Sequence, residues 1–182
     1  MKHMKKGGNT RHRPFTEMSF LTENMRRKEL EITDFNEIIK IIKKNRVLVL
    51  GLTDKDKPYL VPLNYVEEIT IDRISIYFHC ALSGKKLDLI RKNYSCSFVI
   101  YNDFGVERLE EEQTATTRYE SIIGSGTVEI LVESKEKETA GLALLAKYDL
   151  SDLPLNQKAL DGTCFCKITV EEISGKTNKE RA

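Results

Sequence analysis

The feature that most constrains the fold is a run of 17 residues, TTRYESIIGSGTVEILV (116–132), that contains no proline and reads as extended chain throughout. Ordinary strands have about 5–6 residues, so a straight strand of this length is unusual. Gly124 and Gly126 can bend it, because glycine in a strand marks bulges and corners. A barrel wall that curves around a corner explains both the length and the glycines.

Three segments predict helices. Asp34 precedes Glu37 by three positions, as in a capping pair, and apolar residues then recur on one face. Ser83 is expected to cap a second helix, and Asn93 to end it in a left-handed conformation. The predicted helices cover 34–45, 83–93 and 134–148.

Short β-branched and aromatic runs between turn-like segments predict the other strands. Because they follow one another through short connections, we expect an antiparallel sheet of about six strands that closes into a Greek-key barrel. The fold class is therefore mainly β with helices (α+β). The expected strands are 46–52, 57–67, 72–80, 96–101 and 164–176, together with the long run, and polar loops are expected at 102–113 and 151–162.

Composition limits the partners. The 182 residues, 40% of them hydrophobic, fit one domain, expected over 25–176 between a flexible basic N-terminal tail (1–24) and a C-terminal tail (177–182). The 29 basic residues nearly balance the 28 acidic ones, which gives no electrostatic reason to expect a nucleic-acid or membrane partner. No segment approaches the about 18 apolar residues of a membrane span, so a cytoplasmic protein is expected.

The four cysteines are too few for a disulfide scaffold in a chain of 182 residues. The CFC pair at 164–166 lacks the two-residue spacing of a zinc knuckle. We therefore expect reduced cysteines that pack in the interior, and no metal site.

The stretch FHCALSGKK (78–86) carries the strongest local sign of a ligand. It places His79 at the end of a strand and Ser83, Gly84, Lys85 and Lys86 at the start of a helix. Free backbone N–H groups, the positive end of the helix dipole and two ammonium groups at one point suit a phosphate. The alternative is an ordinary strand end followed by a solvated helix face, since SGKK is much less specific than a Walker motif.

Five segments follow one another along the chain: MRRKELEITD, KPYLVPLNYV, FHCALSGKKLDLIRKN, RYESIIGSGTVEI and ISGK. In this order they resemble the pyridoxamine 5′-phosphate oxidase-like flavin-binding split barrels, and most of all their Nim branch, the 5-nitroimidazole-resistance proteins. The resemblance covers about residues 25–176, and FHCALSGKKLDLIRKN is its most specific part.

The resemblance implies a homodimer with FMN in a groove at the interface. The proline-bearing strand of the family would place backbone groups at the edge of the flavin ring, its histidine-to-lysine segment would hold ribityl and phosphate, and its tyrosine-to-serine strand would approach from the partner chain. The residues so implied are Val61, Pro62, Leu63, Asn64 and Tyr65; His79, Ala81, Ser83, Gly84, Lys85 and Lys86; and Tyr119, Ser121 and Ile122.

The function that follows is an FMN-dependent oxidoreductase that takes electrons from a nicotinamide or another donor and passes them to a small acceptor, such as a nitroaromatic or 5-nitroimidazole compound. His79 is the candidate proton donor. The segment EEISGKTNKERA (171–182) has no counterpart of the arginine-rich end by which true pyridoxamine phosphate oxidases hold their substrate, which disfavours vitamin B6 oxidation. FAD is an alternative cofactor, haem ranks below both flavins, and a non-catalytic barrel that stores or senses flavin or haem is the alternative function.

Overall fold

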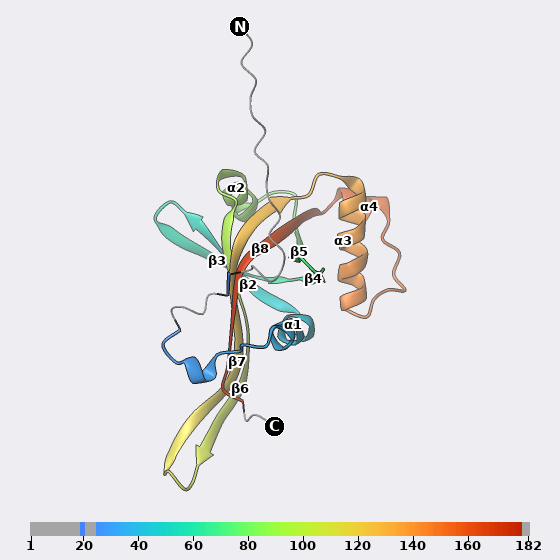
Figure 1. Cartoon of the computed structure of the whole chain (residues 1–182). Coiled ribbons are helices and arrows are strands. Elements are labelled where there is room, and N and C mark those ends of the chain that lie inside the picture. Colours follow the sequence, from blue (N-terminus) through green and yellow to red (C-terminus); the bar gives the residue numbers. More distant parts are fainter. Residues whose placement is uncertain (1–18, 21–24, 180–182) are drawn as a thin grey trace.

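The computed structural model describes residues 19–20 and 25–179, and its main feature is one strongly curved antiparallel sheet (Figure 1). Along the hydrogen-bonded path the strand order is β3-β2-β6-β7-β8-β5-β4, and the two-residue β1 pairs in parallel with β8. The strands are β1 (Ser19–Phe20), β2 (Val47–Asp54), β3 (Lys57–Asn64), β4 (Val66–Ile69), β5 (Ile74–Cys80), β6 (Ser95–Leu109), β7 (Thr114–Ile130) and β8 (Cys164–Thr177).

Among the described residues, four helices and one short 3-10 helix accompany the sheet, and Figure 1 shows α3 and α4 together on one side of it. None of the helices in the described part of the chain combines the length and the apolarity needed to cross a membrane. The helices are α1 (Phe35–Lys44), α2 (Lys85–Lys92), α3 (Ser134–Lys147) and α4 (Gln157–Asp161), and η2 covers Lys28–Leu30.

The predicted antiparallel split barrel is confirmed, but it is not a closed ring of six strands. The described residues form eight strands, and no strand pairing joins β3 to β4 at the two ends of the sheet. The expected single strand 57–67 is two strands, because the chain leaves β2 at Asn64, turns at Tyr65 and pairs with β5 from Val66 onward. β3 and β5 nevertheless contact each other, so the curved sheet brings its two ends together.

The segment 102–113, expected to be a polar loop, is mostly strand. β6 continues through it to Leu109 and pairs with β7 along its length, with a bulge between Asp103 and Val106. This hairpin projects beyond the other strands, at the end of the molecule opposite α2 (Figure 1). Its polarity misled the prediction because both faces of a projecting hairpin meet water, so no buried face imposes an apolar pattern.

The long strand was predicted correctly and bends where expected. β7 has 17 residues, and its pairing with β8 shifts register between Ser125 and Gly126. A Cβ atom on Gly126 would lie 2.0 Å from the carbonyl oxygen of Thr169, so only glycine allows the two backbones to approach this closely.

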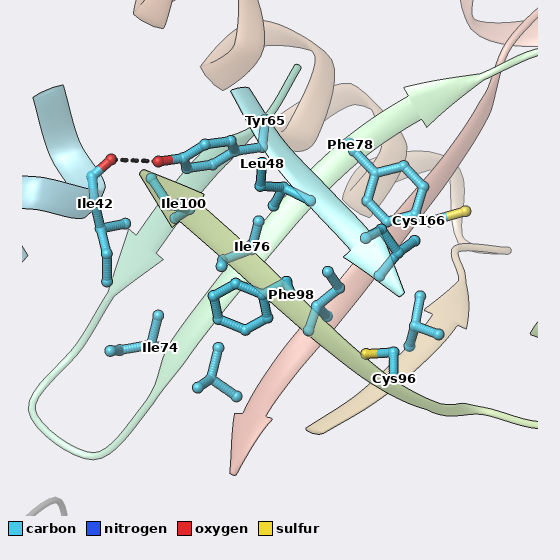
Figure 2. Close-up of a cluster of buried hydrophobic side chains, with 14 of the residues drawn as sticks. Ile42, Leu48, Tyr65, Ile74, Ile76, Phe78, Cys96, Phe98, Ile100 and Cys166 are labelled. Atoms are coloured by element: carbon cyan, nitrogen blue, oxygen red, sulfur yellow. Dashed lines mark hydrogen bonds between the residues drawn. The ribbon is translucent and has the colours of Figure 1, made fainter. Parts of the chain in front are cut away.

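The core lies inside the curved sheet, and α1 adds its buried face to this core and contacts β7 and β4. Asp34 caps α1 as predicted, with its carboxylate accepting a hydrogen bond from the backbone N–H of Asn36 at 2.9 Å. Ile38, Ile41 and Ile42 of α1 are buried. The hydroxyl of the fully buried Tyr65 donates to the carbonyl oxygen of Ile42 at 2.6 Å, which fixes the helix to the turn between β3 and β4 (Figure 2).

The termini extend the sheet beyond the expected domain limits. Residues 1–18 and 21–24, most of the predicted N-terminal tail, lie outside the described residues, whereas Ser19–Phe20 form β1. At the other end the backbone N–H of Asn178 donates to the carbonyl oxygen of Tyr119 at 2.9 Å, beyond residue 176 where we expected the domain to end.

Candidate functional site

The start of α2 differs from the prediction at its cap. The N-cap is Gly84, with φ 133° and ψ 164°, and no side chain caps the helix, so Ser83 does not have the predicted role. The positive φ is a conformation that glycine adopts at little cost. Residues 81–84 are all exposed, and no atom lies within 4 Å of the position that a Cβ on Gly84 would take. The N-terminus of α2 therefore opens on free space.

The other end of α2 also differs from the prediction. Asn93 is the C-cap residue in an extended conformation, with φ −149°, and not a left-handed terminator. Its side-chain oxygen accepts a hydrogen bond from the backbone N–H of Ser95 at 3.0 Å. The helix therefore passes directly into β6, because an extended cap residue already points the chain along the strand.

The two predicted phosphate-binding lysines have different surroundings. Lys85 forms an ion pair with Asp54 at 2.7 Å and lies over the ring of Tyr59, 5.1 Å from its centroid. The hydrogen bond and charge of Lys85 lower the pKa of Asp54, and Asp54 raises the pKa of Lys85. Lys86 lies over the ring of Phe78, with its ammonium 5.6 Å from the centroid. An anion at this helix start would therefore compete with Asp54 for Lys85.

Asn64 of β3 and His79 of β5 line one cavity of about 340 Å³. We call it the Asn64–His79 cavity. The His79 side chain is exposed and its ring lies 6.2 Å from the ring of Phe165, centroid to centroid. The rest of the lining is mostly apolar and comes from α3, α4, the segment between them and the start of β8: Gly141, Leu144, Leu145, Tyr148, Leu150, Leu155, Ala159, Thr163 and Phe165. The sequence did not indicate that α3 closes a cavity around His79.

The side chains of the predicted ring-binding strand β3 alternate between the two faces of the sheet. Val61 and Leu63 pack against the core, while Pro62 and Asn64 are exposed on the outer face. Tyr65 is fully buried, and burial raises the pKa of its phenol well above the ordinary value. The sequence-based assignment of backbone contacts between Val61, Leu63 and Tyr65 and a ligand stays a prediction. β3 ends the strand order, so its outer backbone edge pairs with no strand of the described chain.

The side chains of the predicted site residues on β7 also lie on two different faces of the sheet. Ile122 is fully buried in the core, whereas Tyr119 and Ser121 are partly exposed on the opposite face. The ammonium of Lys176 lies over the ring of Tyr119, 6.0 Å from its centroid. Tyr119 and Ser121 therefore share the outer face of the sheet with Pro62 and Asn64.

That outer face carries a continuous apolar row. Strand pairing aligns Pro62 with Val49, Val49 with Val99, and Val99 with Ile123, across β3, β2, β6 and β7. Ile123 is 54% exposed and Pro62 is exposed, although neither lies at a turn. We call Pro62, Val49, Val99 and Ile123, with the neighbouring Leu60 and Tyr101, the outer sheet face. Exposed apolar surface of this kind is typical of an interaction site.

Comparison with known proteins places the chain by both sequence and fold. The family model described as pyridoxamine 5′-phosphate oxidase matches residues 34–177. Comparison with curated protein sequences finds no match.

Solved structures share the fold at low sequence identity. A candidate 5-nitroimidazole antibiotic resistance protein from Bacteroides thetaiotaomicron has a TM-score of 0.70 at 24% identity, over 81% of this chain and 86% of that one. A flavocytochrome from Azotobacter vinelandii has a TM-score of 0.74 at 14% identity, over 87% and 73% of the two chains. An FAD- and haem-binding protein from Mycobacterium smegmatis has a TM-score of 0.67 at 14% identity, over 82% and 73%.

Proposed function

The chain belongs to the pyridoxamine 5′-phosphate oxidase family, and on that premise we propose that it binds FMN and uses it to transfer electrons to a small acceptor, such as a nitroaromatic compound. The observation that carries the proposal is the convergence of Asn64 and His79 on one apolar cavity. The start of α2, which follows His79 closely along the chain, faces open space. A flavin requires these features together: a flat apolar surface, a few polar groups at its edge, and a site for its phosphate.

The residues have separate tasks in this proposal. The N-terminus of α2, with Gly84 and Lys85, would hold the phosphate, since its backbone N–H groups and dipole favour an anion. The outer backbone edge of β3, which pairs with no strand among the described residues, would meet the edge of the ring. Bound flavin supplies the hydride and single-electron chemistry, and the protein orients it and limits water around it. His79 would donate a proton to the acceptor, because its exposed ring borders the cavity.

A second copy of the chain would complete the site. Tyr119 and Ser121 lie on the outer sheet face, and an apolar row on that face gives a second copy a surface to cover. We propose a homodimer that pairs through the outer sheet face, so that Tyr119 and Ser121 of each chain approach the flavin of the other. A nicotinamide is the donor that we propose to test first.

Two of the solved structures that share this fold are a flavocytochrome and an FAD- and haem-binding protein, so the identity of the cofactor is the first question. The test is the visible spectrum of the freshly purified protein, followed by mass analysis of what acid releases. We expect a flavin spectrum and FMN at about one per chain. A Soret band would instead indicate haem, and a colourless protein that binds no added FMN would refute the proposal.

Two variants test the assigned roles. Lys85→Ala should weaken FMN binding about 10-fold, because the exposed Lys85 ammonium would otherwise form a charge-assisted hydrogen bond with the phosphate. Lys92→Ala, at the opposite end of the same helix, is the matched control and should bind normally.

His79→Gln should keep its flavin but turn over nitro compounds more slowly, and unchanged turnover at full occupancy would remove the proton-donor role.

A further inference from the structure

Three of the four cysteines converge in a way that the proposed flavin site does not use. Cys80 ends β5 and is registered opposite Cys164, at the start of β8. Cys166 lies two residues further along β8, so its side chain is on the same face of the sheet as that of Cys164. The three sulfur atoms all lie within 4.8 Å of one another. We call these residues the three-thiol cluster.

We propose that the three-thiol cluster is a binding site for a thiophilic d¹⁰ metal ion, either Cu(I) held by the three thiolates alone or Zn²⁺ with a water molecule as its fourth ligand. All three cysteines are free, so each sulfur remains available as a ligand. The inference does not depend on the proposed flavin chemistry.

The spacing of the sulfur atoms fits one ion. With metal–sulfur bonds of about 2.3 Å, three thiolates around a metal lie about 3.8–4.0 Å apart, whether the arrangement is tetrahedral or trigonal. The observed limit of 4.8 Å is therefore close to what coordination requires. Small side-chain rotations would close the remaining difference without moving the strands.

The composition of the cluster selects the kind of ion. It holds three sulfur atoms and, within the described part of the chain, neither a histidine nitrogen nor a carboxylate oxygen. Thiolates favour soft and borderline ions such as Cu(I) and Zn²⁺, whereas Mg²⁺, Ca²⁺ and Mn²⁺ prefer oxygen ligands. A three-coordinate soft ion needs nothing further, and Zn²⁺ needs one more ligand.

The three-thiol cluster is largely buried but can be reached from solvent on one side. Cys164 and Cys166 are buried, Cys166 completely, and both belong to the main core together with Phe78, the residue registered opposite Cys166 (Figure 2). Cys80 is only partly buried, so an ion or a water ligand can reach the cluster from its side.

One cation can offset the charge of a filled site. Three thiolates with a divalent ion carry a net charge of −1, and with a monovalent ion −2. The ammonium of Lys86 interacts electrostatically with the Cys80 sulfur, and Lys86 lies over the ring of Phe78 beside the cluster. A nearby positive charge reduces the cost of holding a negatively charged site in a partly apolar environment.

The test uses the full-length chain, purified under reducing conditions and stripped of metal. Zn²⁺ and Cu(I) are titrated separately against a chromophoric competitor, and the bound ion is counted after dialysis. We expect one ion per chain and a thiolate-to-metal charge-transfer band. Cys80→Ser should weaken binding by more than about 100-fold, because loss of a ligand should exceed the 10–100-fold effect of losing an outer-shell partner.

The matched control is Cys96→Ala, since Cys96 is a buried cysteine outside the cluster. It should bind the ion as the parent does. Equal affinity of Cys80→Ser, Cys96→Ala and the parent would overturn the proposal, and so would a parent that retains neither ion. If Cys80→Ser does not fold, alkylation of the parent decides: bound ion should protect Cys80 from iodoacetamide, and unchanged labelling would refute the site.

Discussion

Glu120 is the carboxylate among the described residues that is most completely removed from water, with 2% of its surface exposed. Burial alone would raise the pKa of Glu120, but hydrogen bonds from Lys179, Lys44 and Asn102 outweigh it and lower that pKa. The Asn102 side-chain amide donates at 2.6 Å, and both lysines form ion pairs with the carboxylate. One side chain thus ties α1, β6 and the end of the described chain to β7.

We predict that Glu120→Gln lowers the free energy of unfolding at pH 7 by about 1–3 kcal/mol, the usual cost of losing hydrogen bonds to a charged group. Because the pKa of Glu120 is lower in the folded state, its contribution is complete above the unfolded value, about 4.3, and is lost as the pH falls through the folded value. Urea unfolding between pH 3 and 7 measures both effects.

Glu171→Gln is the control for Glu120→Gln, because Glu171 is an exposed carboxylate on the neighbouring strand β8. Its variant should follow the parent curve at each pH. The parent should lose more stability than Glu120→Gln as the pH falls, so parallel curves for those two proteins would contradict the assigned role of Glu120.

At the scale of elements, the close approach of β7 and β8 decides how the sheet curves. The register shift between Ser125 and Gly126 lets β7 bend while it remains paired with β8. Backbone atoms of Thr169 occupy the space that a side chain at 126 would need. The bend therefore depends on the absence of a single carbon atom.

Gly126→Ala should cost about 3 kcal/mol or more, since the added Cβ meets a carbonyl oxygen that can move only with its strand. Gly51→Ala is the matched control: it is also a strand glycine, and its added Cβ would make contacts no closer than 3.4 Å. We expect that control to change the free energy of unfolding by less than about 1 kcal/mol. Similar losses in both variants, measured by thermal unfolding, would show that the approach of β7 to β8 is not special.

The position of α3 is also set by contacts between elements that are distant in the sequence. Lys147 of α3 forms an ion pair with Glu67 of β4, and its ammonium lies 3.9 Å from the ring centroid of Tyr65. Burial lowers the pKa of Lys147, while Glu67 acts in the opposite direction. This pair positions α3 as the wall of the Asn64–His79 cavity, although residues 67 and 147 are distant in the sequence and no local pattern links them.

At the scale of the whole molecule, the outer sheet face is the surface through which we propose that two copies of the chain pair. Its apolar row crosses four strands in register, and it adjoins Asn64, Tyr119 and Ser121 of the proposed flavin site. A dimer through this face would bury the row and bring residues of both chains to one cofactor.

Ile123→Arg should therefore convert the protein to a monomer and reduce its flavin content, because an unpaired charge in the centre of an interface is strongly unfavourable. Ile71→Arg is the control: Ile71 is 92% exposed and lies between β4 and β5, away from the row. Light scattering and the ratio of flavin to protein check both variants. An Ile123→Arg protein that stays dimeric with full flavin would contradict this interface.

The sequence by itself determined the local order of the chain. Asp34 capped α1 as predicted, and the extended run through Gly124 and Gly126 became the bent strand β7, because caps and strand periodicity depend on neighbouring residues. The sequence also predicted that His79 lies at the end of a strand and shortly before α2 along the chain, although it assigned the helix cap to Ser83 instead of Gly84. Which of these two residues is the N-cap depends on the backbone φ at each position, and that angle is set by how α2 packs on the rest of the structure.

Only the tertiary structure decided which distant residues meet. Curvature of the sheet brings Asn64 to His79, and strand register brings Cys80 to Cys164 and Cys166, although the CFC spacing gave no sign of a site. The tertiary structure also decided that the polar segment 102–109 is part of a strand, because pairing across a hairpin outweighed its weak local β-propensity. Local propensities act over a few residues, whereas these contacts join segments that are up to about 85 residues apart in the sequence.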